Sequence, residues 1–122
     1  MGANIKTPAQ ITEALFKASQ YAENSCKLPL IFALDEEGGR VARIGRNSNF
    51  NVTKVVAMRT IGDSGDTSKA YEAGDTIGSY LQGYGFNMDL VPVLDTITNS
   101  DNTVIGDRSF GTDPELVWSM AS

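Results

Sequence analysis

The sequence predicts an α/β fold in which helices alternate with buried parallel strands. Two short apolar runs, 28–34 and 87–94, have the length and the flanking Pro and Gly residues of strands. A stretch with helical spacing of apolar residues precedes each run, which is the order of βα units and implies a parallel sheet. Charged residues and glycines follow the strands, at the edge of the sheet where α/β proteins bind ligands.

The first helix is expected from Thr7 to about Asn24. Thr7 is a suitable N-cap, Pro8 suits the first helical position, and Gln10 can complete a capping box. One face of this helix should pack on the sheet, because its apolar residues recur at helical spacing, at Ile11, Leu15, Ala18 and Ala22.

The run 28–34 is expected to form a strand that is covered on both faces. It is short, it begins near Pro29, and Gly38 and Gly39 follow it. The segment from Val41 to about Ser64 is rich in Asn, Gly, Ser and Arg. We expect a long loop there, with at most one helical turn around the apolar patch 55–58.

A second helix is expected to open at Asp66 and to stop at Gly83 or Gly85. Its inner face would place two glycines in close contact with the sheet and would consist of Ala70, Tyr71, Gly74, Ile77, Gly78 and Leu81. The run 87–94 then forms the second buried strand, and a polar loop continues to Gly111. A third helix follows with Asp113 as its cap, and Phe110 and Trp118 are interpreted as packing residues.

Composition excludes several classes of protein. The chain is 41% hydrophobic and 20% charged, as in soluble globular domains, and its net charge of −5 without a basic cluster argues against nucleic acid or an anionic membrane as a partner. There is no histidine, so a Ser-His-Asp triad is impossible, and the single Cys26 excludes an internal disulfide and a multi-cysteine metal site. No metal is expected, since a conventional zinc site is ruled out by the lack of histidine and the single cysteine, and no cofactor is expected, since the sequence has no nucleotide-binding glycine motif. No apolar run could cross a membrane, and segment 1–6 lacks the apolar core of a signal peptide.

Charged residues after the first predicted strand are candidates for a ligand site. Asp35 could accept hydrogen bonds from sugar hydroxyls, bind a metal or act as a base; alternatively it caps a loop or pairs with Arg40 or Arg43. The two arginines offer forked donors for hydroxyl pairs, carboxylates or phosphates. Their alternative is a solvated loop or an ion pair with Glu36 or Glu37.

The loop after the second predicted strand holds three more candidates. Arg108 could reach the ligand site or brace its loop through Asp107. Asp95, directly after the strand, could support the site without touching a ligand, or it could cap the loop.

These segments resemble the N-terminal barrel domain of glycoside hydrolase family 3, particularly its bacterial β-N-acetylhexosaminidase branch. The resemblance extends over most of the 122 residues. It rests on 29–43 and 84–95, on 99–102, and above all on Asp35-Glu36-Glu37-Gly38-Gly39-Arg40 together with Gly106-Asp107-Arg108-Ser109-Phe110.

The resemblance implies that 1–122 is part of a (β/α)8 TIM barrel, about strands 2 and 3 with flanking helices; a whole barrel takes about 250 residues. It implies retaining hydrolysis of terminal β-linked N-acetylglucosamine from peptidoglycan or chitin. Asp35, Arg43 and Arg108 match substrate-binding residues, and Arg40, Asp95 and Asp107 would brace them. Glu36 stands where the family often has Gln, without expected effect on sugar contacts. No catalytic residue is assigned, because the family's Lys-His pair, acid/base His and nucleophilic Asp lie beyond this sequence.

Several readings stay open. The chain could be a non-catalytic small α/β module that binds a sugar or an anion, a subunit completed by another polypeptide, or part of a β-glucosidase of the same family. In each case the expected partner is a carbohydrate or anion. The isolated chain is expected to be inactive because it lacks the family's catalytic residues, and its exposed sheet edges would favour self-association. The compartment stays open, with the cytoplasm favoured.

Overall fold

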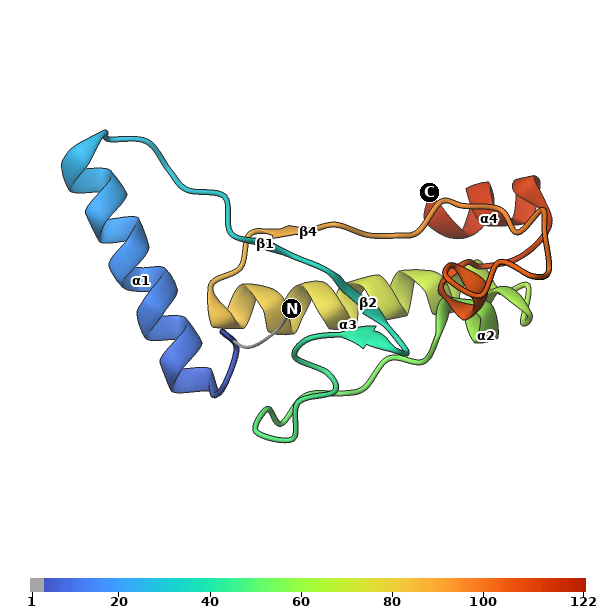
Figure 1. Cartoon of the computed structure of the whole chain (residues 1–122), viewed down its shortest axis with the longest axis horizontal. Helices are drawn as coiled ribbons and strands as arrows, with labels where there is room; N and C mark the ends of the chain where they lie inside the picture. Colours follow the sequence, from blue (N-terminus) through green and yellow to red (C-terminus); the bar gives the residue numbers. More distant parts are fainter. Residues whose placement is uncertain (1–3) are drawn as a thin grey trace.

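The computed structural model describes residues 4–122, so residues 1–3 of the segment 1–6 lie outside the described part. Helices and short strands alternate along it, in agreement with the predicted α/β class (Figure 1). In chain order the elements are α1 (Pro8–Ser25), β1 (Ala33–Leu34), β2 (Glu36–Gly38), β3 (Val41–Ala42), α2 (Met58–Gly62), α3 (Thr67–Tyr84), β4 (Met88–Asp89), the 3₁₀ helix η1 (Gly106–Arg108) and α4 (Pro114–Ala121). Within 4–122, no helix combines the length and hydropathy needed to span a bilayer.

A parallel ladder joins β1 to β4, with Ala33 opposite Met88 and Leu34 opposite Asp89. The side chain of Asn87 extends this pairing, since it accepts from the Phe32 N–H at 2.7 Å and donates to the Leu30 carbonyl at 2.9 Å. In Figure 1 the two strands run side by side above α3. The parallel pair with an intervening helix is the βα arrangement that the sequence predicts.

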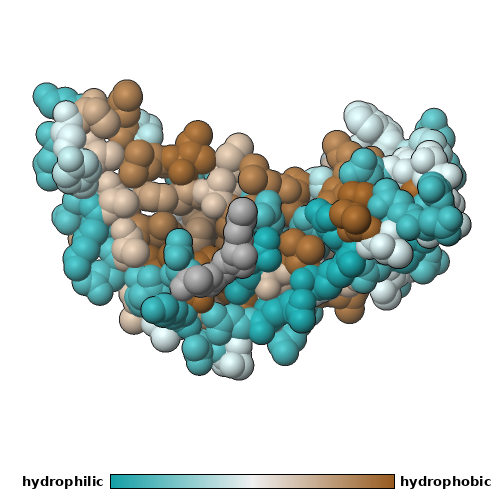
Figure 2. Space-filling model, viewed as in Figure 1, coloured by the Kyte–Doolittle hydropathy of each residue, from teal (hydrophilic) through white to brown (hydrophobic). Residues whose placement is uncertain are grey.

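The predicted strands 28–34 and 87–94 are too long, and their burial on both faces is wrong. Only two residues of each run join the ladder, and the side chains of Leu28, Ile31, Leu90 and Leu94 are exposed. Figure 2 shows hydrophobic residues on the surface between α1 and the strand pair. Among the described residues no third strand flanks the pair, so its outer backbone and one face lack a partner.

Helix α1 begins where the sequence predicts and has the predicted cap Thr7, but the second bond of the capping box differs. The Thr7 hydroxyl accepts from the Gln10 N–H at 3.2 Å, but the Gln10 side chain accepts from the Lys6 N–H at 3.1 Å. The reciprocal bond of a capping box would go to the Thr7 N–H. Helix and cap therefore agree with the prediction, whereas the second capping bond is shifted by one residue.

Helix α3 has the predicted ends, and its predicted inner face is correct at Ile77 and Leu81 but not at Tyr71, Gly74 and Gly78. The Asp66 carboxylate accepts from the Ser68 N–H at 3.0 Å, and Gly85 closes the helix with φ of 97°. The buried residues are Ala73, Ile77 and Leu81, whereas Tyr71, Gly74 and Gly78 are exposed. One residue rotates a helix by about 100°, so the two glycines lie beside the buried stripe and face open space.

The predicted long loop 41–64 is partly wrong. It begins with β3, which pairs with β2 in an antiparallel hairpin through the positive-φ residues Gly38 and Gly39. The helical turn predicted within the loop is present as the short helix α2, which starts at Met58, the last residue of the predicted apolar patch. The third predicted helix is α4, capped by Asp113 as expected.

The core consists of two clusters on either side of the hairpin. The first holds α1 against the strands and α3, and its buried members are Ile11, Leu34, Ile44, Phe50, Ile77, Leu81 and Phe86. The second holds α2, α3 and α4 together, with Met58, Ile61, Ala73, Phe110, Val117 and Met120. Phe110 therefore packs as predicted, while Trp118 is 69% exposed, so its predicted packing role is wrong.

Two helix glycines should respond oppositely to alanine. At Gly62 a Cβ would collide with the backbone carbonyl of Phe110, so Gly62→Ala should lower the free energy of unfolding by about 3 kcal/mol, the upper end of the usual cost of overpacking. At Gly74 nothing lies within 4 Å, so Gly74→Ala should raise it by about 0.5–1 kcal/mol through helix propensity alone. Urea unfolding of both variants checks this. Equal effects would contradict the close contact between α2 and residue 110.

Candidate functional site

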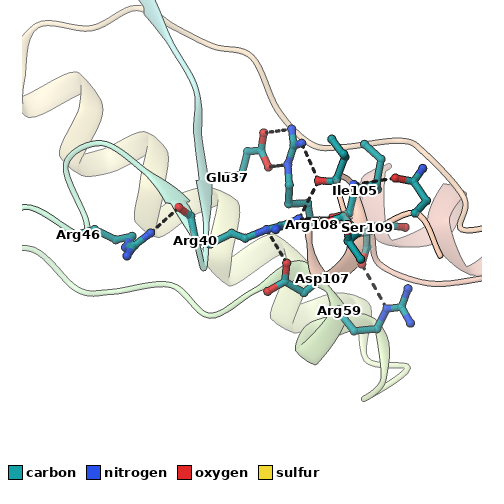
Figure 3. Close-up of polar contacts among 11 residues, drawn as sticks. Glu37, Arg40, Arg46, Arg59, Ile105, Asp107, Arg108 and Ser109 are labelled. Atoms are coloured by element: carbon teal, nitrogen blue, oxygen red, sulfur yellow. Dashed lines mark hydrogen bonds and ion pairs between the residues drawn. The ribbon is translucent and has the colours of Figure 1, made fainter. Parts of the chain in front are cut away.

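Four charged residues meet where the hairpin β2–β3 approaches the loop 103–109: Arg40 pairs with Asp107, and Glu37 pairs with Arg108 (Figure 3). Asp35 lies between β1 and β2, Arg43 directly follows β3, and Arg108 ends η1. The chain reverses after β2, which brings Arg43 back towards Asp35. Loop 103–109 then approaches the same hairpin from the far end of the sequence.

Asp35 and Arg43 form an open ion pair. An Nη2 atom of Arg43 lies 3.4 Å from Oδ2 of Asp35, and the side chains are 30% exposed for Arg43 and 45% for Asp35. This is the one side-chain hydrogen bond of the Arg43 guanidinium among the described residues. Most of its N–H groups and part of the Asp35 carboxylate can therefore reach a polar ligand.

Arg108 is held tightly by Glu37. Its Nε and Nη2 atoms donate to the two carboxylate oxygens at 2.7 Å each, and Nη1 donates to the Val104 carbonyl at 3.3 Å. Glu37 is 6% exposed. A guanidinium has five N–H groups, so one on Nη1 and one on Nη2 are left for a ligand.

The environment of Arg108 is strongly negative. Hydrogen bonding to Glu37 raises the pKa of Arg108, and the charges of Asp35 and Asp95 raise it further. Arg108 therefore stays charged. The predicted brace through Asp107 is not the one observed, because Asp107 faces Arg40 instead.

Arg40 connects the hairpin to the loop before η1. One Nη2 atom lies 2.7–3.0 Å from the carbonyls of Thr103, Val104 and Ile105, and Nε lies 2.9 Å from Oδ1 of Asp107 (Figure 3). Arg46 in turn donates to the Arg40 carbonyl at 2.7 Å. Neither Arg40 nor Arg43 has the ion pair with Glu36 or Glu37 considered from the sequence. Arg40 contacts three backbone carbonyls and Asp107, and Glu37 pairs with Arg108 instead.

Asp95 contributes its backbone to the site's frame. The buried Ser109 hydroxyl lies within hydrogen-bonding distance of the Asp95 carbonyl and, at 3.1 Å, of the Gly111 carbonyl. The same oxygen accepts from the Gly111 N–H at 3.2 Å. These contacts close the loop from 95 to 111, and Arg59 on α2 donates to the Ser109 carbonyl at 3.5 Å.

Glu36 is the residue that sequence reasoning missed. It is fully buried, and its carboxylate accepts from three backbone N–H groups, at Arg43, Ile44 and Gly45, and from the Tyr80 hydroxyl. Strand alternation was the available signal. Side chains 35 and 37 of an extended segment share one face, so Glu36 points to the opposite side, into the core.

Asp89 lies at the end of β4, next to these acids. Its Oδ1 accepts from the Glu36 N–H at 3.0 Å, while its buried Oδ2 has no partner among the described residues. Burial raises the pKa of Asp89 to about 6; hydrogen bonds from Glu36 and Leu90 oppose this, and the charges of Glu36 and Asp35 add to it. The group is thus protonated more readily than an ordinary aspartate.

This arrangement suits the binding of a hydroxylated or anionic ligand. It offers one open carboxylate and two guanidinium groups on a braced loop frame. Among residues 4–122, no group of three His, Cys, Asp or Glu is placed to hold a metal ion. A hollow of about 600 Å³ between α3 and α4 includes Glu36 and Glu37 in its lining, but none of Asp35, Arg43 and Arg108.

The profile described as "Glycosyl hydrolase family 3 N terminal domain" matches residues 1–122. Beta-hexosaminidase A of Pseudoalteromonas piscicida is 37% identical over 96% of this chain and 20% of its own length. The beta-hexosaminidase of Nitrosomonas eutropha is 34% identical over 97% of this chain and 33% of its own.

Solved structures of family 3 enzymes are also similar to this chain. A family 3 beta-N-acetylglucosaminidase from Paenibacillus sp. superposes with a TM-score of 0.88 at 38% identity, over 99% of this chain and 22% of that one. NagZ from Neisseria gonorrhoeae, in complex with N-trifluoroacetyl-D-glucosamine, superposes with a TM-score of 0.82 at 27% identity, over 99% and 35%. The chain therefore spans about a fifth to a third of the length of these relatives.

Stability should depend on pH through Asp89. Its pKa is raised from 3.8 to about 6, so the folded chain holds a proton that the unfolded chain has lost, and the free energy of unfolding falls as pH rises through this interval. Asp89→Asn should lack this contribution. Urea unfolding between about pH 3.5 and pH 7 should show the original chain losing stability relative to the variant. Asp75→Asn, at an exposed position of α3, is the control, and parallel curves for Asp89→Asn would contradict the assignment.

Proposed function

The chain belongs to the glycosyl hydrolase family 3 N-terminal domain family, and from this we propose that it supplies the sugar-binding wall of a β-N-acetylhexosaminidase. The substrate would be terminal β-linked N-acetylglucosamine in material derived from peptidoglycan or chitin. The observation that carries the proposal is the open ion pair of Asp35 and Arg43 directly after β1, beside the hairpin residue Glu37 that holds Arg108. The named activities of the relatives, and the sugar analogue in the NagZ complex, support the substrate class.

The three side chains have complementary roles in this proposal. The exposed Asp35 carboxylate accepts hydrogen bonds from hydroxyls of the non-reducing sugar. Arg43 donates to the same sugar from its open N–H groups. Arg108 donates from the two N–H groups that Glu37 and Val104 leave free. Arg40, Asp107 and Asp95 hold the two loops so that these donors and acceptors converge.

The barrel assignment belongs to the same proposal. We place β1 and β4 as neighbouring strands of a (β/α)8 barrel, about the second and third. Their parallel pairing, the helix between them and the position of the site at their carboxyl ends support this placement. The exposed Leu90 and Leu94 beside the ladder would then favour self-association of the isolated chain.

A non-catalytic sugar- or anion-binding module is the second candidate. Two arginines with open donors suit a carboxylate or phosphate as well as hydroxyls. A β-glucosidase of the same family would differ in its lack of a requirement for the acetamide group. Binding measurements with N-acetylglucosamine, glucose and inorganic phosphate separate these alternatives.

Sugar binding should depend on Asp35. We expect saturable binding of N-acetylglucosamine to the 122-residue chain by NMR titration. Asp35→Ala should weaken it at least about tenfold, since hydrogen bonds to a charged group are lost. Glu13→Gln, in an exposed ion pair on α1, should leave the affinity unchanged. Preference for phosphate would favour the anion-binding module, equal affinity for glucose would favour the glucosidase, and unchanged affinity in Asp35→Ala would refute the site.

The isolated chain should not hydrolyse a chromogenic N-acetyl-β-glucosaminide. Retaining hydrolysis needs a nucleophile and a proton donor on opposite sides of the scissile bond, with carboxyl groups about 5–5.5 Å apart when both are acids. The sequence has no histidine, and the acids at the site are engaged in binding or bracing. Release of the chromophore is followed for the chain and for Asp35→Ala. Turnover by the chain that disappears in the variant would show that this account of the machinery is wrong.

A further inference from the structure

We propose that Glu36 is the positioning residue of the sugar site, because its carboxylate and its N–H hold the backbone on both sides of the Asp35–Arg43 pair. The inference rests on the proposed function, in which these two residues contact the sugar. Glu36 itself is fully buried, so the role we assign to it is indirect. It acts through the segment 43–45 on one side and through β4 on the other.

The carboxylate of Glu36 closes the chain reversal between 36 and 45. Its Oε2 accepts from the N–H groups of Arg43 and Ile44, the latter at 3.0 Å. Its Oε1 accepts from the Gly45 N–H at 2.7 Å. Three consecutive N–H groups thus converge on one charged side chain, and hydrogen bonds of this kind are about twice as strong as neutral ones.

Arg43 has little else to hold it. The ladder between β2 and β3 is short and irregular, since Glu36 pairs with Ala42 and Gly38 with Val41. The guanidinium of Arg43 has the single 3.4 Å contact to Asp35. The bond from its own N–H to Glu36 therefore determines where the Arg43 side chain starts. Gly45 permits this packing, because a Cβ there would lie 3.1 Å from Oε1 of Glu36.

The same residue fixes Asp35. The Glu36 N–H belongs to the peptide group that follows Asp35, and it donates to Oδ1 of Asp89 on β4 at 3.0 Å. The Asp35–Glu36 peptide is thereby tied to the strand pair. Arg43 and Asp35 are thus placed by the carboxylate and by the N–H of one residue.

Tyr80 on α3 also contacts the carboxylate of Glu36. Its hydroxyl donates to Oε1 of Glu36 at 2.8 Å. Burial, and then the bond to Glu36, raises the pKa of Tyr80, so the hydroxyl remains a donor at any physiological pH. This bond does not involve Arg43. Tyr80→Phe is therefore a matched control that perturbs the same buried carboxylate without releasing the arginine.

Two replacements of Glu36 separate the effect of its charge from the effect of its side-chain length. Glu36→Asp keeps the charge, but the shorter side chain cannot span to the N–H groups of Arg43 and Ile44. Glu36→Gln keeps the length and one carbonyl oxygen, which can still accept from both of these groups on the Oε2 side. The Gly45 N–H would then lose its acceptor, while Tyr80 can reverse its role.

The test combines amide hydrogen exchange with titration of N-acetylglucosamine, using the 122-residue chain. We expect Glu36→Asp to speed exchange at Arg43 and Ile44 and to weaken sugar binding by roughly tenfold, as for a lost charged hydrogen bond. Glu36→Gln should retain protection at both amides and an affinity within about threefold of the original, and Tyr80→Phe should stay within about twofold. Sugar affinity that is unchanged when the Arg43 amide is released would overturn the proposal.

Two further outcomes are distinguishable. If Glu36→Asp does not fold, Glu36→Gln carries the test, because loss of binding with both amides still protected would overturn the positioning role. If the original chain binds no sugar, the proposed function fails. The positioning role is then judged by nuclear Overhauser contacts between the Arg43 and Asp35 side chains. These should disappear in Glu36→Asp and persist in Tyr80→Phe, and persistence in both would refute it.

Discussion

Two neighbouring buried carboxylates impose the main constraint on this molecule. A charge removed from water needs charged or hydrogen-bonding partners, so the surrounding chain must place such groups next to it. Glu36 gathers three backbone N–H groups and a tyrosine hydroxyl, while Glu37 takes the fork of Arg108. Because the two side chains point to opposite faces of one short strand, the hairpin is anchored to α3 on one side and to the loop 103–109 on the other.

The sequence is most informative where structure is local. Thr7, Asp66 and Asp113 cap helices at the predicted positions, and Gly85 ends α3 in the left-handed conformation, because each signal acts within a few residues. The strands are less predictable. Their length depends on lateral partners elsewhere in the chain, so an apolar run indicates a strand and does not show how much of it is paired.

The site shows the same division. The motif after β1 and the one around Arg108 indicate which side chains gather, and Asp35 and Arg43 do meet. The partner of each arginine was not predictable. Arg108 pairs with Glu37, which is 71 residues away in the sequence, and not with its neighbour Asp107. Glu36 was overlooked for a related reason. Among three successive acids, only the direction of each side chain separates a ligand contact from an internal anchor.

Helix α3 is shared by both halves of the core. Ala73 belongs to the cluster with α2 and α4, whereas Ile77, one turn further on, belongs to the cluster with α1 and the strands. The border between the clusters thus crosses the interior of one continuous helix. If either cluster unfolded, part of the buried face of α3 would become exposed to water. The helix therefore makes the two clusters a single cooperative unit, and the folding of the hairpin between them depends on both.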